Sequence, residues 1–415
     1  MRFFTRPLAL AAVAATALMT APAFAADAPK VEVIHWWTSG GESAAVKVFA
    51  DAFTKSGGVW VDSAIALGET ARAAGINRIV GGNPPGMMMF NTGKQLDELV
   101  KSGYLADLDK EAAAGKWKDV LPKAIVDASV RDGHFYALPV NIHGQNWLWY
   151  NTKLFADAGV TEPKTWSDVV AAGAKLKAKG VVALAHGGQS WQDHILFDAV
   201  LAGEGGSDLF LKVYSKDALA AIADPKFKHV AEVYAQLRDL MDPGMPGRNW
   251  NDATSMIITG KGAMQVMGDW AKGEFIAAGQ TVGKEYGCAV IGAGGGYVIG
   301  GDVFVFPKLK DAAGTAAQSK LANVMFSPEV QIAFNMKKGS VPVRTDADGS
   351  SMDACAQKGI AALKDPDKQL PSTNYTISPD LNGALNDVIT QFLNTPAMKV
   401  DDFIAKFAAA VKAAG

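Results

Sequence analysis

Short apolar runs alternate with longer amphipathic segments along most of this chain. Residues 31–37 (VEVIHWW) and 59–66 have strand character, whereas residues 42–56 carry apolar side chains at the three-to-four-residue spacing of a helix. The run at residues 86–90, GMMMF, is apolar throughout, as expected of a strand covered on both faces. Further strands are predicted at residues 133–140, 181–185, 262–267 and 303–306. Further helices are predicted at residues 95–102, 152–159, 312–325 and 400–414. This alternation predicts an α/β fold with largely parallel sheets.

Three short segments interrupt this pattern and mark candidate crossings between two lobes. They lie at residues 141–151 (NIHGQNWLWYN), at 300–302 and at 339–344. Three crossings would make both lobes discontinuous in sequence. The chain has 415 residues, which is enough for two domains of ordinary size.

The first 25 residues have the features of a secretory signal peptide. Arg2 and Arg6 precede a short apolar run at residues 8–20, and Ala23-Phe24-Ala25 fits the small-x-small cleavage pattern. The apolar run is short for a membrane span, so an N-terminal anchor is the less favoured alternative. We therefore expect a mature protein that begins at Ala26, is exported to the periplasm and does not span the membrane.

Composition and charge narrow the function classes. The formal net charge of −2 gives no bulk electrostatic reason to bind nucleic acid or an anionic membrane. Hydrophobic residues make up 49% and charged residues 20% of the chain, as in an ordinary globular protein. The six histidines show no HExxH or comparable metal-ligand spacing, and GxxxxGK[ST] and GxSxG motifs are missing from the sequence. We expect no metal, no cofactor and no nucleic-acid partner.

Cys288 and Cys355 are the two cysteines of the chain. In an exported protein they can form one disulfide, which would close a loop of 355 − 288 = 67 residues. The chain-entropy relation gives about 4 kcal/mol of stabilisation for a loop of that length. Two buried free thiols are the alternative.

Five stretches carry a family resemblance. They are IHWWTSGGE, NTGKQLDELVKSGYLADL, NWLWYNTKLF, MGDW and GGDVFVFPK. Their order resembles that in periplasmic solute-binding proteins of ABC sugar importers (extracellular solute-binding protein family 1), with the glucose/mannose-binding branch as the nearest. The resemblance covers nearly the whole mature chain. It implies a type II periplasmic-binding-protein fold, with two lobes, a hinge, an interlobe ligand cleft and a closed form that docks onto a membrane permease.

The resemblance and the three crossings together give a domain prediction. The signal peptide is residues 1–25. Residues 26–144 with 300–344 form the N-terminal lobe, and residues 145–299 with 345–415 form the C-terminal lobe.

A sugar site needs two kinds of side chain. Aromatic faces cover the apolar C–H patches of the ring, and charged or amide groups bond its hydroxyls. Hydrogen bonds to charged groups contribute about 1.5–3 kcal/mol each. Tryptophans close to carboxylates and lysines are therefore the candidates.

Trp36 and Trp37 adjoin where a strand gives way to a loop. Strand alternation would turn one ring to the core and the other to the cleft, although both could be core residues. The resemblance implies that the pair lies at the cleft wall, and we favour Trp37 as the stacking face. Glu42 stands at a predicted helix start, where a carboxylate favours the helix dipole. The resemblance implies that Glu42 also accepts from sugar hydroxyls; a capping role alone is the alternative.

Three further candidates follow predicted strands or glycine turns. Lys94 follows a strand end, where ligands of α/β sheets bind, and the resemblance gives it a polar sugar contact. Trp270, in GDW, could stack on the opposite face of the sugar. Asp302, in GGDVF, could accept from two neighbouring hydroxyls, since two glycines allow close backbone approach. A solvated lysine, a core tryptophan and a turn-forming aspartate are the respective alternatives.

The remaining candidates rest on weaker signals. Lys337 precedes the turn at Gly339, and by resemblance it donates to the sugar; surface solvation is the alternative. Trp191, in AHGGQSWQ, could add an aromatic wall, with core packing as the alternative. Residues 374–376 (NYT) could supply a further contact.

The sequence thus predicts a non-enzymatic, monomeric periplasmic protein that captures a monosaccharide and delivers it to an ABC importer permease. Glucose is the ligand expected first, and mannose or galactose are the next candidates. Two alternatives remain: an exported glycoside hydrolase that uses Glu42 and Asp302 as its carboxylate pair, and a binding protein that serves chemotaxis or sensing.

Overall fold

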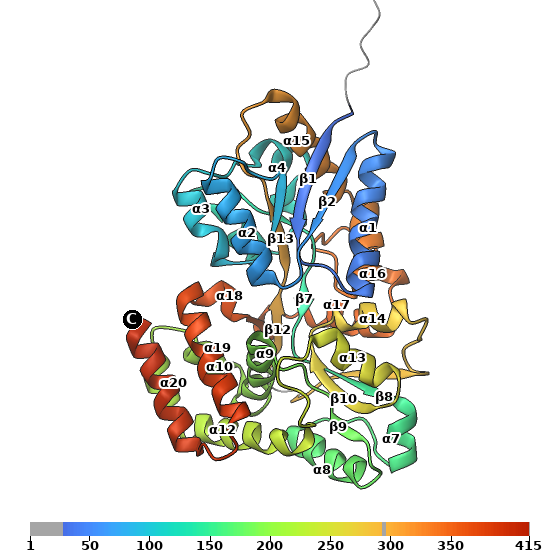
Figure 1. Ribbon diagram of the computed structural model, residues 1–415, viewed down its shortest axis with the longest axis vertical. Coiled ribbons are helices and arrows are strands. Elements are labelled where there is room, and N and C mark those ends of the chain that lie inside the picture. The colour runs from blue at the N-terminus through green and yellow to red at the C-terminus, as the bar shows by residue number, and fades with distance from the viewer. Residues whose placement is uncertain (1–27, 293–295, 415) are drawn as a thin grey trace, which may run out of the picture.

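The computed structural model describes residues 28–292 and 296–414 (Figure 1). A five-stranded sheet of order β2-β1-β3-β13-β6 forms the upper half of the molecule as drawn. Its strands are β1 (Lys30–His35), β2 (Val59–Ala64), β3 (Met87–Asn91), β6 (Leu138–Pro139) and β13 (Asp302–Val305). The predicted signal peptide, residues 1–25, lies outside the described residues.

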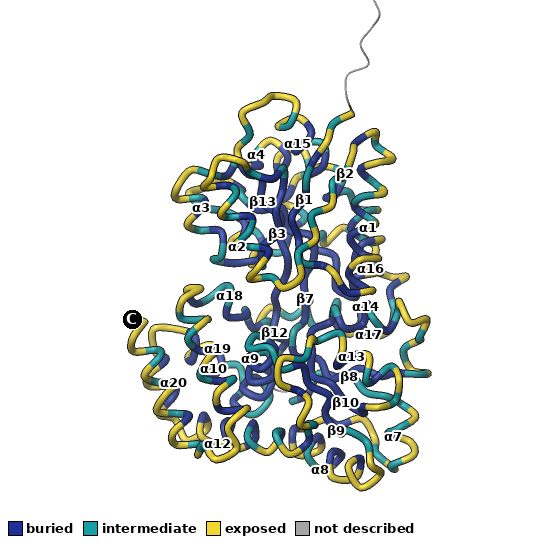
Figure 2. Tube along the Cα trace, viewed as in Figure 1, coloured by how far each residue is buried: buried dark blue, intermediate teal, exposed yellow. Residues whose placement is uncertain are grey.

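Strand β3 is buried on both faces, as its continuous apolar run predicts. Met87 and Met89 join one core cluster, together with α1 (Gly40–Lys55), α15 (Ala312–Phe326) and α16 (Pro328–Lys338). Met88 and Phe90 join another, together with α2 (Gly68–Val80) and α3 (Asp97–Lys101). Helices therefore cover both faces of this sheet, and the buried stretches run through its middle (Figure 2).

The lower half contains a second sheet, of order β11-β8-β10-β9. Its strands are β8 (Trp147–Asn151), β9 (Val182–Leu184), β10 (Gly262–Met267) and β11 (Tyr286–Val290). The helices around it include α8 (Trp166–Lys177), α9 (Ser190–Val200), α12 (Pro225–Leu237), α19 (Pro379–Asn394) and α20 (Val400–Ala414). Phe197, Tyr234, Phe392 and Phe403 belong to the core of this half.

The expectation of largely parallel sheets is wrong, because both sheets are mixed. Strand β1 runs parallel to β2 and β3, but β13 runs antiparallel to β3 and β6. In the lower sheet, β8 runs antiparallel to β10 and β11. Both β8 and β13 enter their sheets directly from the segment between the halves, so they run opposite to the strands that end there.

The segments at the three predicted crossings lie side by side. A third sheet, of order β14-β12-β7, joins β14 (Gln369–Pro371), β12 (Tyr297–Gly300) and β7 (His143–Gly144). Only Gly301 separates β12 from β13, and a Cβ there would lie 2.7 Å from the carbonyl oxygen of Asn141. Ile142 bridges Val341 of the third segment. The lobe boundaries given above remain a proposal.

Several predicted elements have the expected bounds and others do not. Strand β10 and helix α20 begin and end where the pattern predicts. The single strand predicted at residues 133–140 is wrong. The chain there forms β5 (His134–Phe135), which pairs with β4 (Val130–Arg131), and then turns into β6 of the main sheet.

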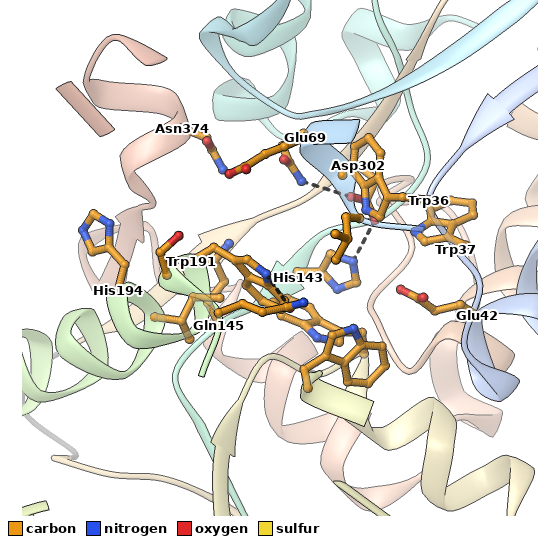
Figure 3. Close-up of a pocket in the computed structure, with 18 of the residues that line it drawn as sticks. Trp36, Trp37, Glu42, Glu69, His143, Gln145, Trp191, His194, Asp302 and Asn374 are labelled. Carbon is orange, nitrogen blue, oxygen red and sulfur yellow. Dashed lines mark hydrogen bonds and ion pairs between the residues drawn. The ribbon is translucent and has the colours of Figure 1, made fainter. Parts of the chain in front are cut away.

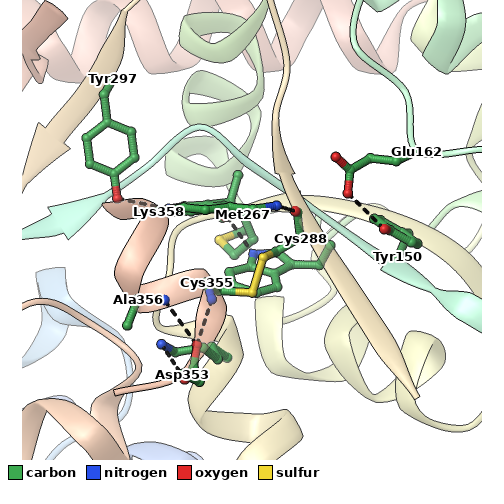
Figure 4. Close-up of a disulfide and its surroundings, with 12 residues drawn as sticks. Tyr150, Glu162, Met267, Cys288, Tyr297, Asp353, Cys355, Ala356 and Lys358 are labelled. Atoms are coloured by element: carbon green, nitrogen blue, oxygen red, sulfur yellow. Dashed lines mark hydrogen bonds and ion pairs between the residues drawn. A yellow bond between two sulfur atoms is a disulfide. The ribbon is translucent and has the colours of Figure 1, made fainter. Parts of the chain in front are cut away.

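The predicted disulfide joins Cys288 of β11 to Cys355 of α17 (Ala354–Ala362), with the two Cα atoms 6.2 Å apart (Figure 4). Asp353 caps α17 by accepting from the backbone N–H groups of Cys355 and Ala356, at 2.9 and 3.0 Å. The bridge therefore fastens the start of this helix to an edge strand of the lower sheet.

Within residues 28–292 and 296–414, every helix is too short or too polar to cross a membrane.

Candidate functional site

A cavity of about 430 Å³ lies between the two halves and is lined by residues of both (Figure 3). Trp36, Glu42 and Asp302 come from the upper half, and Trp191 and Trp270 come from the lower half. The volume falls within the usual range for small-molecule sites.

Alternation along β1 continues past its end and separates the two adjacent tryptophans. Trp37 is 1% exposed, and its ring packs edge-on against Phe304 and tilted against Phe334. Trp36 is half-buried, and the Arg72 guanidinium carbon lies 5.4 Å from its ring centroid. The structure therefore leaves Trp36, rather than the favoured Trp37, with a ring face available for stacking. Trp37 still lines the cavity, and its buried Nε1 has no partner among the described residues.

Glu42 stands at the start of a helix, as predicted, and it also lines the cavity. Helix α1 begins at Gly40, and the side chain of the N-cap residue Ser39 accepts from the backbone N–H of Glu42. The Glu42 carboxylate accepts from Lys338 Nζ at 2.9 Å and from Ser39 Oγ at 3.2 Å. Glu42 and Lys338 are both buried, and both line the cavity.

Asp302 belongs to a buried charged row between the halves. His143 Nε2 lies 3.0 Å from Asp302 Oδ2, and His143 Nδ1 bonds Asp269, which follows β10. Asn141 Nδ2 donates to the same Asp302 oxygen at 2.9 Å, whereas within the described part of the chain Asp302 Oδ1 has a single longer contact, 3.4 Å from Asn91 Nδ2. Oδ1 is therefore the Asp302 oxygen with capacity left for a ligand.

The charges in this row keep Asp302 ionised. Burial alone would raise the pKa of Asp302, but the charge and hydrogen bond of His143 hold that pKa below its ordinary value. Burial likewise would lower the pKa of His143, but the carboxylates of Asp269 and Asp302 raise it instead. An ionised Asp302 can only accept hydrogen bonds, which suits a partner that carries hydroxyl groups.

The opposite wall is aromatic. Trp270 packs edge-on against His143 with ring centroids 4.9 Å apart, and its centroid lies 6.2 Å from that of Trp191. The Trp270 ring also explains the glycine in MGDW, because a Cβ on Gly268 would lie 2.1 Å from it. Trp250 lines the same wall and was not predicted. Trp250 could have been found by the sequence feature that it shares with Trp191. Both are tryptophans at the start of a helix, directly after a loop that contains glycine.

The two predicted lysines lie outside the cavity lining. Lys94 donates to the carbonyl oxygen of Thr376 at 2.7 Å. Lys337 is exposed on α16, and its neighbour Lys338 points into the cavity instead. Adjacent helix residues point about 100° apart, and no periodic signal near the Gly339 turn shows which lysine faces inward.

Other polar residues of the lining were not predicted, although Asn374 belongs to the weak NYT candidate. They include Glu69, Asn91, His143, Gln145, His194, Asp198, Asn382 and Asn386. His143 and Gln145 lie in the first crossing segment, which is the only sequence signal they carry. The others lie on elements and loops that are far apart in the sequence.

The cavity can hold a small polyhydroxylated solute and offers little for bond cleavage. Its lining combines aromatic side chains from both halves with hydrogen-bond acceptors and donors. Among the described residues, no three histidine, cysteine or acidic side chains are grouped as metal ligands. Two halves, crossing segments between them and a polar–aromatic cavity lined by both halves define a solute-binding protein.

Comparison with known proteins gives the family. Residues 37–332 match the family of bacterial extracellular solute-binding proteins, and the chain belongs to this family. The family consists of binding proteins rather than enzymes and acts outside the cytoplasm, as the sequence predicts. The alternative of a glycoside hydrolase is therefore rejected. Its proposed carboxylates also have other partners, since Glu42 pairs with Lys338 and Asp302 pairs with His143.

Curated relatives match almost end to end. A probable sugar-binding periplasmic protein of Rhizobium meliloti is 36% identical over 414 residues, which is 97% of this chain and 98% of that protein. A protein of the same description from Mesorhizobium japonicum is 37% identical over 407 residues, covering 95% of this chain and 97% of the relative.

Solved structures show the same fold at low sequence identity. The bacterial solute receptor AcbH, described as having an exclusive preference for β-D-galactopyranose, is 19% identical with a TM-score of 0.78, over 92% of this chain and 98% of its own. Maltose-bound MalE3 of T. maritima is 17% identical, also with a TM-score of 0.78, over 92% and 99% of the two chains. The predicted two-lobed type II architecture is confirmed.

Proposed function

We propose that this protein captures a sugar in the cavity and delivers it to the permease of an ABC importer. The observation that carries the proposal is a cavity lined by an indole of the upper half, Trp36, and an indole of the lower half, Trp270, together with the buried ionised Asp302. Pyranose rings present apolar patches to aromatic faces and hydroxyls to carboxylates, so both groups would have a partner in a bound sugar.

The relatives support a sugar as the ligand class. The two rhizobial proteins are described as probable sugar-binding periplasmic proteins, and a protein of Haloferax volcanii that is 26% identical is described as xylose/arabinose-binding. For the ring itself we propose a hexose in the order glucose, then mannose or galactose, which follows the resemblance to the glucose/mannose-binding branch.

The contacts suggest how binding would couple to closure. Asp302 and Glu42 belong to the upper half, whereas Trp191, Trp250 and Trp270 belong to the lower half. A ligand that touches both halves favours the conformation in which both contacts are made. The permease would then recognise the closed form.

A calorimetric screen of glucose, mannose, galactose, xylose and arabinose tests the proposal. We expect at least one sugar to bind and Asp302→Asn to weaken it by roughly tenfold to a hundredfold, because a hydrogen bond to a charged group contributes about 1.5–3 kcal/mol. Asp387→Asn, an exposed carboxylate on α19, is the matched control and should leave affinity unchanged. Absence of binding by every sugar, or equal affinity in Asp302→Asn, would contradict the proposal.

A further inference from the structure

The cavity continues along helix α9, beyond the tryptophan walls. Two pairs of α9 residues, each four positions apart, line it: Trp191 with Ile195, and His194 with Asp198. Residues at this spacing lie one above the other on a helix. Helix α9 therefore presents one apolar and one polar row side by side. From Trp191 to Asp198 the helix rises about 10 Å, and the lining extends over all of it.

Helix α19 supplies the facing side of this extension through Asn382 and Asn386, which are again four residues apart. His194 Nδ1 lies 2.7 Å from Asn386 Oδ1, which leaves the Asn386 amide N–H groups without a partner among the described residues. Asn382 Oδ1 is buried and likewise has no partner there.

Tyr214 holds the polar row in place. Its hydroxyl donates to Asp198 Oδ1 and lies 3.1 Å from His194 Nε2. Burial raises the pKa of Tyr214 well above its ordinary value, so the hydroxyl keeps the proton that it donates. The second Asp198 oxygen has no bond within the described part of the chain. His194 and Asp198 are buried at 3% and 4% exposure.

A purely structural role does not account for this arrangement. A network that only packed α9 against α19 would be expected to pair its buried polar atoms internally, because each unpaired one costs about 1–3 kcal/mol. Among the described residues, Asn382 Oδ1 is buried and unpaired. The second Asp198 oxygen and the Asn386 amide N–H₂ also have no hydrogen-bond partner there, and all three atoms belong to residues that line the cavity. An acceptor beside a donor matches a pair of neighbouring hydroxyls.

The extension lies apart from the first ring site. Figure 3 shows His194 on one side of the cavity and Trp37 with Glu42 on the other, with Trp191, Gln145 and His143 between them. We infer that His194, Asp198, Asn382 and Asn386 form a second subsite, the α9–α19 subsite, for a second sugar ring. The inference rests on the proposed function and makes its ligand a disaccharide or longer oligosaccharide, rather than the monosaccharide expected from the sequence.

Calorimetry with glucose, galactose, maltose, cellobiose and lactose tests this inference. We expect at least one disaccharide to bind tenfold or more tightly than its component hexoses. Asn382→Leu and Asp198→Asn, made separately, should each remove most of that advantage and change hexose affinity less than threefold. Asp198→Asn keeps an acceptor for Tyr214, so it preserves the supporting network. Asp387→Asn, on the exposed side of α19, should keep the full advantage.

The outcomes separate the two claims. Hexose binding that depends on Asp302, without any gain for a disaccharide, would overturn the α9–α19 subsite alone. A disaccharide advantage that survives both variants, each with an unchanged unfolding temperature, would also overturn it. A protein that binds neither class of sugar would overturn the proposed function as well.

Discussion

At the scale of single residues, the direction of each side chain decides which candidates reach the cavity. Trp36 and Trp37 are one position apart, and alternation places the first at the cavity and the second against Phe304. The sequence predicts that the two rings separate but not which ring faces which way, because the strand ends at His35 and the loop sets the rest. Lys337 and Lys338 are a second case, at a helix end: the sequence does not show which of the two adjacent side chains faces the cavity.

Replacing Lys338 tests its buried pairing with Glu42. Lys338→Met should lower the free energy of unfolding by about 3 kcal/mol, because it leaves the Glu42 carboxylate buried without its cation. Lys337→Met, one residue earlier and exposed, should change it by less than about 0.5 kcal/mol. Urea unfolding of both variants gives the comparison, and adding Glu42→Gln to Lys338→Met should recover part of the loss. Equal stability of the two lysine variants would refute the pairing argument.

Trp270 should contribute to sugar affinity far more than to stability. Its half-buried ring lines the cavity, so Trp270→Ala should weaken binding at least tenfold, which is about 1.4 kcal/mol. Trp60→Ala is the matched control, because Trp60 is also half-buried but lies outside the lining, on β2. Affinity by calorimetry and unfolding by circular dichroism separate the two effects. If stability falls as much as affinity, the ring is a core residue.

At the scale of elements, a continuous hydrophobic pattern predicts the burial and bounds of a strand or helix well. It does not predict where a stretch changes its pairing partner from one sheet to another. The apolar run of β3 predicts burial on both faces, and the bounds of β10 and α20 follow directly from their patterns. The stretch at residues 133–140 also reads as one strand, but its two ends pair in different sheets. The direction of a strand also cannot be predicted from its own residues. Strands β8 and β13 run antiparallel to their neighbours because of where the chain enters each sheet.

The bridge between β11 and α17 should stabilise the protein by restricting its unfolded chain. Replacing Cys288 and Cys355 together by serine should lower the free energy of unfolding by about 4 kcal/mol, given the 67-residue separation. Sugar affinity should be unchanged, because neither cysteine lines the cavity. Denaturant titrations with and without reductant measure the effect. Two reactive thiols in the unfolded, non-reduced protein would show that the bridge is not formed.

At the scale of the whole molecule, the cavity collects side chains that the sequence keeps far apart. The predicted crossings locate part of its lining, since His143 lies in the first crossing segment and Asp302 in the second. The α9–α19 subsite has no such signal in the sequence. Its two helices are far apart along the chain and come into contact only through tertiary packing. A family resemblance transfers motif positions, and it cannot find residues that lie outside those motifs.

The charged row at the crossing should make stability depend on pH. His143 has a raised pKa, so its contribution is full below the ordinary value of 6.5 and is lost as the pH rises through the raised value. Asp302 has a lowered pKa, so its contribution is full above the ordinary value of 3.8 and is lost as the pH falls through the lowered value. The free energy of unfolding should therefore be greatest between these limits.

Urea unfolding across this pH range measures the dependence. His143→Gln should remove much of the decline on the alkaline side. His134→Gln is the control, because Asp109 also raises the pKa of His134, but that residue is exposed and far from the crossing. An alkaline decline that persists in His143→Gln and disappears in His134→Gln would assign the effect to the surface pair.

A crystal structure grown with a saturating concentration of the tightest-binding sugar tests the central claim most directly. We predict a pyranose ring between the indoles of Trp36 and Trp270, with Asp302 Oδ1 within hydrogen-bond distance of a ring hydroxyl. A sugar bound elsewhere on the molecule, with the space between those two indoles free of ligand density, would contradict the account.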